Sequence, residues 1–213
     1  MKKLAILGDS YSAFPGSSPD DYAIWYNDTG IKECNDVHSV SEMWWYPVVK
    51  FFDLDLITNC SYSGSTVCNI GFDGDDFSKI SFNYRMKREL SPDTDVDVIL
   101  ILGGTNDFWA ASPVGEPKYS DWEDHELNCF CQAFCYTLDY LTKQHPNATI
   151  LNILNDEIQG PIREYTKEIC EHYNVDNLDL VDIDKEDGHP TKLGMRQIAN
   201  QVSKWDSFVN SIK

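Results

Sequence analysis

The feature that most constrains the fold is the run Val-Asp-Val-Ile-Leu-Ile-Leu at residues 96–102, followed directly by two glycines. A short, β-branched and nearly continuous apolar run is typical of a strand buried on both faces of a parallel sheet. Shorter strand-like runs occupy 4–8, 55–59, 149–154 and 178–183. The sequence therefore predicts a sheet of about five strands, with the run at 96–102 as its clearest member.

Segments with helical spacing of apolar residues alternate with these strands. They cover 40–52, 122–144, 158–173 and 191–212. This alternation predicts one α/β domain over the whole chain, a three-layer sandwich with a mainly parallel central sheet and helices on both faces.

Two stretches do not fit the alternation and are predicted insertions, at about 15–39 and 70–92. Both are polar with scattered aromatic residues, so either can overhang a site at the end of the sheet. We find no internal repeat and no linker, which again favours a single domain.

The charge of the chain argues against several classes of partner. The net charge is −18, from 35 acidic and 17 basic residues. Such a chain repels phosphate backbones and anionic lipid surfaces, so we expect no nucleic-acid partner. No apolar run approaches the ~18–20 residues of a transmembrane helix, so no membrane span is expected.

The first apolar run does not resemble a secretion signal. It follows Lys2 and Lys3 but is only four residues long, at 4–7. A signal peptide needs roughly 7–15 apolar residues, so we interpret the run as the first strand and expect a cytoplasmic protein from the chain as given.

The seven cysteines are odd in number and include no C-x-x-C pair. Structural zinc sites need such spacing, so we expect reduced, buried thiols and no metal.

The chemistry is predicted at the strand ends, because open α/β sheets bind ligands at the carboxyl ends of their strands. The first strand is followed by Gly-Asp-Ser at 8–10, the second by Ser-Gly at 63–64, and the third by Gly-Thr-Asn-Asp at 104–107. The last leads into Glu-Asp-Gly-His-Pro at 186–190. A hydroxyl, a glycine turn, an amide and an imidazole together form the inventory of an acyl-transfer site.

In this order, the four blocks resemble those of the SGNH (GDSL-type) hydrolases. Ser10, Gly64, Asn106 and His189 match the family's Ser, Gly, Asn and His, and Gly194 follows in the last helix. The matches span almost the whole chain and keep their strand context. The resemblance implies a flavodoxin-like sandwich and an esterase that needs no cofactor.

The resemblance also implies the roles of the site residues. Ser10 is the expected nucleophile and His189 its general base. The backbone N–H groups of Ser10 and Gly64 and the side-chain amide of Asn106 are the expected oxyanion donors.

The third member of the triad departs from the family pattern, which is Asp-x-x-His. Glu186 stands three residues before His189, and Asp187 stands two before it. Either carboxylate can hold the imidazole, Asp184 is a third candidate, and a backbone carbonyl would leave a serine–histidine pair. The sequence leaves these alternatives open.

Each block also has a purely structural interpretation. Ser10 can cap a helix, Asn106 can form a turn, Gly64 can be a turn glycine and His189 a loop residue. Their joint occurrence favours the catalytic interpretation. The four other histidines have no matching partners, and no role is predicted for them: His38, His125, His145 and His172.

The expected substrate is a small-molecule O-acyl ester, with a carbohydrate acetyl ester preferred. Phe108 and Trp109, directly after the Asn106 block, are predicted to line its pocket. The other aromatic residues near the site are expected in the core or a lid: Tyr11, Trp25, Tyr26, Trp44 and Trp45. The oligomeric state is not predicted.

Two alternatives are retained, and a third is disfavoured. One is a catalytically impaired domain of the same family that binds a glycan or a protein partner, and another is a lysophospholipase or thioesterase of that family. A nucleotide-binding α/β protein would need a G-x-G-x-x-G loop or a P-loop lysine after the first strand, and residues 8–11 provide neither.

Overall fold

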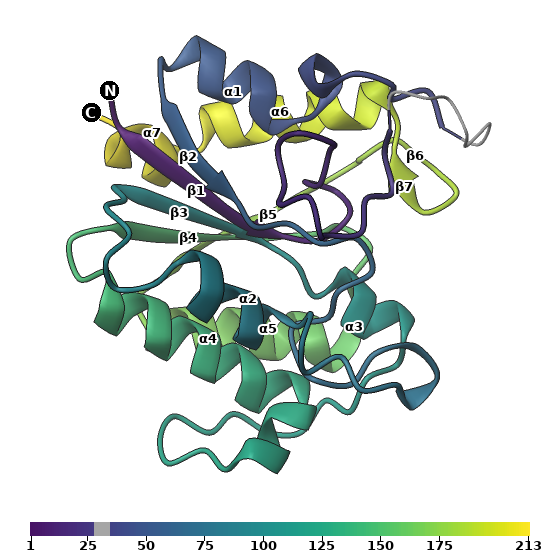
Figure 1. Ribbon diagram of the computed structural model, residues 1–213, viewed down its shortest axis with the longest axis vertical. Helices are drawn as coiled ribbons and strands as arrows, with labels where there is room; N and C mark the ends of the chain where they lie inside the picture. Colours follow the sequence, from purple (N-terminus) through teal and green to yellow (C-terminus); the bar gives the residue numbers. More distant parts are fainter. Residues whose placement is uncertain (28–34) are drawn as a thin grey trace.

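The computed structural model describes residues 1–27 and 35–213. Its core is a five-stranded sheet in the order β2-β1-β3-β4-β5 (Figure 1), in which every pairing is parallel. The strands are β1 Lys3–Gly8, β2 Asp55–Asn59, β3 Val98–Leu102, β4 Thr149–Leu154 and β5 Asp176–Asp179. The predicted α/β class is therefore confirmed, with the strand order of the flavodoxin-like folds.

The clearest predicted strand is the centre of the sheet. All five residues of β3 are buried, and it pairs with both β1 and β4. In the register between β1 and β3, Gly8 is opposite Leu102, so these two strands end side by side. The strand order reverses between β1 and β3, and such a switch point is where open α/β sheets bind their ligands.

Helices cover both faces of the sheet (Figure 1), which confirms the three-layer sandwich. One face carries α1 Trp45–Phe51, α6 Lys192–Lys204 and α7 Asp206–Ser211; the other carries α2 Phe82–Glu89, α4 Phe130–Gln144 and α5 Gly160–His172. Each layer has its own hydrophobic cluster, with Trp44 and Ile198 buried on the first face and Phe82 and Phe134 on the second.

The remaining elements are short. They are the 3-10 turns η1 Val40–Glu42, η2 Phe72–Gly74 and η3 Asp124–Asn128, the helix α3 Thr105–Trp109, and an antiparallel hairpin of β6 Lys185–Glu186 and β7 His189–Pro190.

Three predicted helices are interrupted in the structure. The segment 40–52 is η1 followed by α1, because Met43 between them is extended. The segment 122–144 is η3 followed by α4, because Cys129 is extended at φ −110° and ψ 142°. The segment 191–212 breaks at Trp205, which is also extended and separates α6 from α7. Side-chain periodicity continues across such single-residue breaks, so it does not reveal them.

The last strand was predicted at 178–183 but lies at 176–179. Beyond it, the Leu180 N–H still donates to the carbonyl of Leu154 in β4 at 2.9 Å, and the side chains of Leu180 and Ile183 are buried in the cluster that includes Ile198 of α6. These apolar residues therefore indicate packing against a helix. The strand itself, β5, begins with the polar residues Asp176 and Asn177.

The segment 70–92, predicted as an insertion, contains α2 in its second half. Phe82, Met86 and Leu90 are fully buried, at the four-residue spacing of a helix face.

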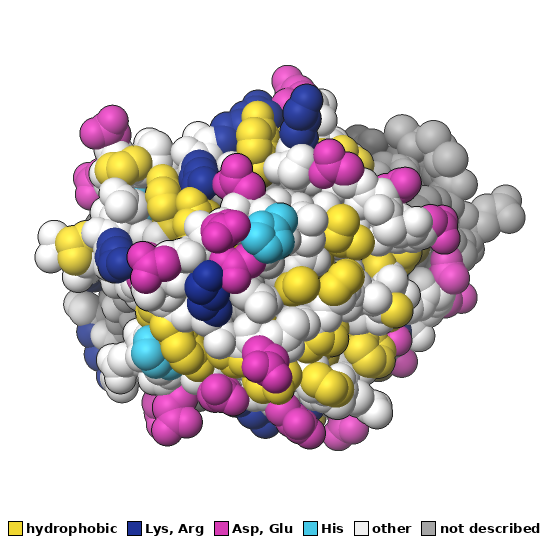
Figure 2. Space-filling model, turned by 90° about the horizontal axis from the view of Figure 1, so that it is seen from below, with side chains coloured by type: hydrophobic (Ala, Val, Ile, Leu, Met, Phe, Trp, Pro, Cys, Tyr) yellow, Lys and Arg dark blue, Asp and Glu magenta, His cyan; other side chains and the backbone are white. Residues whose placement is uncertain are grey.

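On the face seen in Figure 2, Lys and Arg side chains are interspersed with Asp and Glu. Among the described residues, no helix is both long and apolar enough to cross a membrane.

Candidate active site

Ser10 occupies a tight turn directly after β1. The Asp9 carboxylate accepts a hydrogen bond from the backbone N–H of Tyr11 at 3.0 Å, and the Asp9 carbonyl accepts one from the N–H of Ser12 at 3.1 Å. Gly8 allows this turn to approach the loop after β2, since a Cβ there would lie 2.7 Å from the hydroxyl of Ser61. The turn presents the Ser10 hydroxyl at the end of the sheet.

His189 faces this hydroxyl from β7. Its Nε2 lies 3.0 Å from Ser10 Oγ, and its Nδ1 lies 2.9 Å from the backbone carbonyl oxygen of Asp187. A carbonyl only accepts hydrogen bonds, so the contact assigns the proton of the neutral ring to Nδ1. Nε2 then carries the lone pair and faces the serine hydroxyl, which is the arrangement expected for a serine nucleophile and its base.

Two tyrosines tie the histidine hairpin to the rest of the site. The hydroxyl of Tyr11 donates to the carbonyl of Gly188 at 2.7 Å, and that of Tyr26 donates to the carbonyl of Pro190 at 2.7 Å. Both phenols are buried. The backbone carbonyls of Gly188 and Pro190, the residues on either side of His189, are therefore held by side chains that also pack in the core.

The start of the hairpin is held by the end of β4. The Lys185 ammonium contacts Asn155 Oδ1 at 2.9 Å and Asp156 Oδ1 at 2.5 Å. On the other side, Gly194 of α6 packs so closely that a Cβ would lie 2.1 Å from the carbonyl of Asp184. Only glycine fits there, which gives a physical reason for the glycine that follows the His-Pro block.

The carboxylates of Glu186 and Asp187 do not reach the imidazole. Both residues are exposed, and neither side chain makes a hydrogen bond within the described part of the chain. The backbone carbonyl of Asp187, not its carboxylate, is what contacts Nδ1. Asp184 accepts a hydrogen bond from the hydroxyl of Thr191, which caps the start of α6.

The three predicted oxyanion donors follow three neighbouring strands: Ser10 follows β1, Gly64 follows β2, and Asn106 lies in α3 after β3. Gly64 has a φ of +84° in the turn closed by the N–H of Ser65 on the carbonyl of Tyr62, a conformation that favours glycine. Among the described residues, the N–H groups of Ser10 and Gly64 have no acceptor. The Asn106 amide donates to the carbonyl of Ser65 at 3.0 Å, which leaves its second hydrogen available.

Asp107 of α3 ties the Asn106 segment to the loop that carries Gly64. Its carboxylate accepts hydrogen bonds from the N–H of Val67 at 2.8 Å and from the N–H of Cys68 at 3.1 Å. Burial raises the pKa of Asp107 to about 6, although the two N–H donors oppose this rise. The third block thus supplies an amide toward the site and a carboxylate that anchors the loop carrying Gly64.

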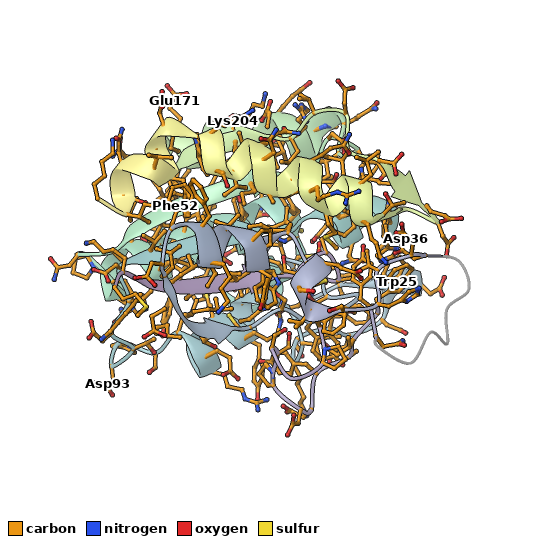
Figure 3. All side chains as sticks on the ribbon, turned by 90° about the horizontal axis from the view of Figure 1, so that it is seen from above. Trp25, Asp36, Phe52, Asp93, Glu171 and Lys204 are labelled. Carbon is orange, nitrogen blue, oxygen red and sulfur yellow. The ribbon has the colours of Figure 1, made fainter. Side chains whose placement is uncertain are left out.

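Aromatic rings surround His189. The indole of Trp25 stacks on the imidazole, with centroids 3.7 Å apart and planes 3° apart, and Trp109 lies 5.6 Å away at a tilt. Figure 3 shows Trp25 and Asp36 at the opposite end of the molecule from Asp93, which precedes β3. Of the pair predicted to line a pocket, Trp109 lies beside the site and Phe108 packs against the core.

The six described cysteines form no disulfide, and all but Cys129 are buried; Cys34 lies outside the described residues. Within the described ranges, no cluster of three or more His, Cys, Asp or Glu residues is arranged to hold a metal.

A serine hydroxyl against an imidazole, next to N–H groups that have no acceptor among the described residues, is the geometry typical of serine hydrolases on a flavodoxin-like sheet. The comparisons agree with this class. The chain belongs to the GDSL-like lipase/acylhydrolase family, whose model matches residues 2–205. It is therefore a hydrolase that acts on ester bonds.

Two solved structures share both sequence and fold with the chain, and both are described as belonging to the GDSL-like lipases. The one from Bacteroides uniformis is 44% identical, with a TM-score of 0.90 and coverage of 94% of this chain and 93% of its own. The one from Bacteroides ovatus is 41% identical, with a TM-score of 0.89 and coverage of 95% and 96%. Comparison with curated proteins gives no match.

More distant structures share the fold alone. A family two carbohydrate esterase from Clostridium thermocellum is 15% identical, with a TM-score of 0.63, and the match covers 95% of this chain and 62% of that one.

Proposed function

We propose that this hydrolase cleaves a small O-acyl ester, with a carbohydrate acetyl ester as the preferred class, through an acyl-enzyme on Ser10. The observation that carries the proposal is the contact of 3.0 Å between Ser10 Oγ and His189 Nε2, with Nδ1 of the same ring on the Asp187 carbonyl. A serine hydroxyl is a weak nucleophile until a base removes its proton, and this geometry is suited to that transfer.

In the first half-reaction, Ser10 Oγ attacks the ester carbonyl carbon while its proton moves to His189 Nε2. The carbonyl oxygen becomes an oxyanion. Its donors are the N–H groups of Ser10 and Gly64, which have no acceptor among the described residues, and the second amide hydrogen of Asn106. The imidazolium then gives its proton to the alkoxide as the C–O bond breaks. The alcohol leaves, and the acyl group remains on Ser10.

In the second half-reaction, water replaces the alcohol. His189 Nε2 accepts a proton from the water as its oxygen attacks the acyl carbon. Collapse of the second oxyanion expels Ser10 Oγ, which recovers the proton, and the carboxylic acid is released. Each proton that the imidazole accepts is returned within the same half-reaction, so no cofactor is needed.

The preference for a carbohydrate ester rests on the aromatic surroundings of the base. Trp25 and Trp109 lie against His189 from two directions, and indole faces stack well on sugar rings. The net charge of −18 disfavours an anionic lipid surface as the place of action. The Clostridium thermocellum relative of the same fold is described as a carbohydrate esterase, bound to cellohexaose.

A substrate panel tests the proposal. Acetylated xylo-oligosaccharides, short nitrophenyl esters and lysophospholipids are offered to the purified protein, with Ser10→Ala as the blank. The proposal predicts the highest kcat/KM on the acetylated sugars. A clear preference for lysophospholipids would replace it with the lysophospholipase alternative. Absence of turnover and of fluorophosphonate labelling would instead favour a binding domain.

A further inference from the structure

Arg85 of α2 is fully buried behind the loop that follows β2. Its Nε donates to the carbonyl of Ile80 at 2.8 Å, its Nη1 donates to the carbonyl of Cys60, and its Nη2 donates to the hydroxyl of Ser65 at 2.7 Å. One guanidinium therefore holds both ends of the segment 60–65, which contains Gly64.

Burial of the Arg85 guanidinium costs free energy that simple packing of the core would not require. The guanidinium bonds to three uncharged oxygens and forms no ion pair with a described residue. Its Cζ lies 4.7 Å from the ring centroid of Phe82 and 5.9 Å from that of Tyr22. A buried cation without a paired carboxylate is expensive, and an apolar side chain of similar size would pack more favourably. The cost is understandable if the exact position of the loop matters.

Ser65 connects the guanidinium to the groups that face the substrate. Its hydroxyl accepts from Arg85 and donates to the carbonyl of Tyr62, its N–H closes the turn around Gly64, and its carbonyl accepts from the Asn106 amide. A shift of Ser65 would therefore move both the Gly64 N–H and the Asn106 amide.

We propose that Arg85 is a positioning residue for the oxyanion site, which sets the Gly64 N–H and the Asn106 amide through the backbone and hydroxyl of Ser65. The proposal rests on the proposed function, since the two donors matter only if an oxyanion forms. Arg85 does not touch the substrate and acts only through the loop.

The test compares Ser65→Ala and Arg85→Lys with the parent on para-nitrophenyl acetate. Ser65→Ala removes the hydroxyl that accepts a hydrogen bond from Arg85 Nη2. Arg85→Lys removes the planar guanidinium that bonds to both ends of the segment 60–65. Rates are divided by the number of active sites that a fluorophosphonate titrates. We expect kcat to fall roughly 10- to 100-fold in both, with KM changed less than about threefold, because misplaced donors weaken only the transition state.

Arg88→Gln is the matched control, because Arg88 lies on the same helix but is exposed and pairs with Asp21. It should keep the parental kcat. If both test variants keep kcat per titrated site within about twofold, the inference is wrong even though the hydrolase is active. If Arg85→Lys does not fold, Ser65→Ala decides alone. A parent without Ser10-dependent turnover would overturn the proposed function itself, which is a different result.

A double-mutant cycle separates positioning from general stability. Ser65→Ala and Asn106→Ala act on the same donor group, so their combined loss should be clearly smaller than the product of the two single losses. A role limited to stability would instead give multiplicative losses together with fewer titrated sites.

Discussion

The indole ring of Trp25 lies flat on the imidazole of His189, with 3.7 Å between centroids and 3° between planes. Trp25 comes from the first predicted insertion, and its backbone N–H donates to the hydroxyl of Ser63, next to Gly64, at 2.7 Å. Trp25 therefore lies beside the imidazole and is anchored at the loop that carries Gly64. The stack restrains the plane of the ring that we propose as the base.

Replacement of Trp25 should reduce turnover. Stacked aromatic pairs contribute about 0.5–1.5 kcal/mol, so we expect Trp25→Ala to lower kcat/KM about 3- to 10-fold. Trp25→Phe keeps a flat ring and should retain most of the activity. Steady-state kinetics on para-nitrophenyl acetate measures this, and equal activity of the alanine variant and the parent would show that the stack does not orient the base.

Removal of the Tyr11 hydroxyl should loosen the histidine hairpin. Tyr11→Phe leaves the Gly188 carbonyl without its donor, at a cost of about 1 kcal/mol of unfolding free energy. Urea unfolding measures the stability, and kinetics measures the expected fall in kcat. Tyr46→Phe is the control, since the Tyr46 hydroxyl makes no hydrogen bond with any described residue. Equal stability losses in the two variants would contradict the account.

The exposed carboxylates of the histidine loop should contribute little to catalysis. Glu186→Ala and Asp187→Ala keep the Asp187 carbonyl on Nδ1, so we expect kcat within about threefold of the parent. Removal of an essential triad carboxylate costs about 10⁴-fold in kcat, which makes the distinction easy. A loss above about 100-fold in either variant would show that its carboxylate reaches the imidazole during turnover.

Titration of the buried Asp9 carboxyl should lower the unfolding free energy of the protein as pH rises from 4 to 7. Burial raises the pKa of Asp9 from 3.8 to about 7, and Asp9 Oδ2 has no hydrogen-bond partner among the described residues. The folded state then holds a proton that the unfolded state has lost, so this stabilisation is complete below pH 4 and disappears as pH rises through 7.

Asp9→Asn tests this linkage because it cannot lose that proton. Relative to the parent, its unfolding free energy should rise by on the order of 3 kcal/mol between pH 4 and pH 8. Chemical unfolding at several pH values gives the difference. A difference that is constant over this range would mean that the pKa of Asp9 is not raised by folding.

The features that depend on a local sequence pattern could be predicted, namely the central strand and the four blocks of site residues. The buried run at 96–102 and the Ser, Gly, Asn and His blocks follow from composition and order, and the structure brings Ser10 and His189 into contact. Strand ends at a switch point converge by topology alone, so their residues can be identified without knowledge of any distance.

The contributions of Trp25 and Arg85 could not be predicted from the sequence. Each acts on a segment far from it along the chain, and neither stands in a recognisable spacing with its partner. The helix α2 carries a signal in Phe82, Met86 and Leu90, but the polar residues between them obscured it. The orientation of Nδ1 toward a backbone carbonyl depends on hairpin geometry, which the sequence leaves open.

The most direct test of the account is hydrolysis of para-nitrophenyl acetate by the parent protein beside Ser10→Ala and His189→Ala. The contact between Ser10 Oγ and His189 Nε2 predicts that the parent turns over and that each variant loses at least about 10³-fold in kcat. Full activity of Ser10→Ala, in a protein that unfolds like the parent, would contradict the assignment of the nucleophile and with it the central claim.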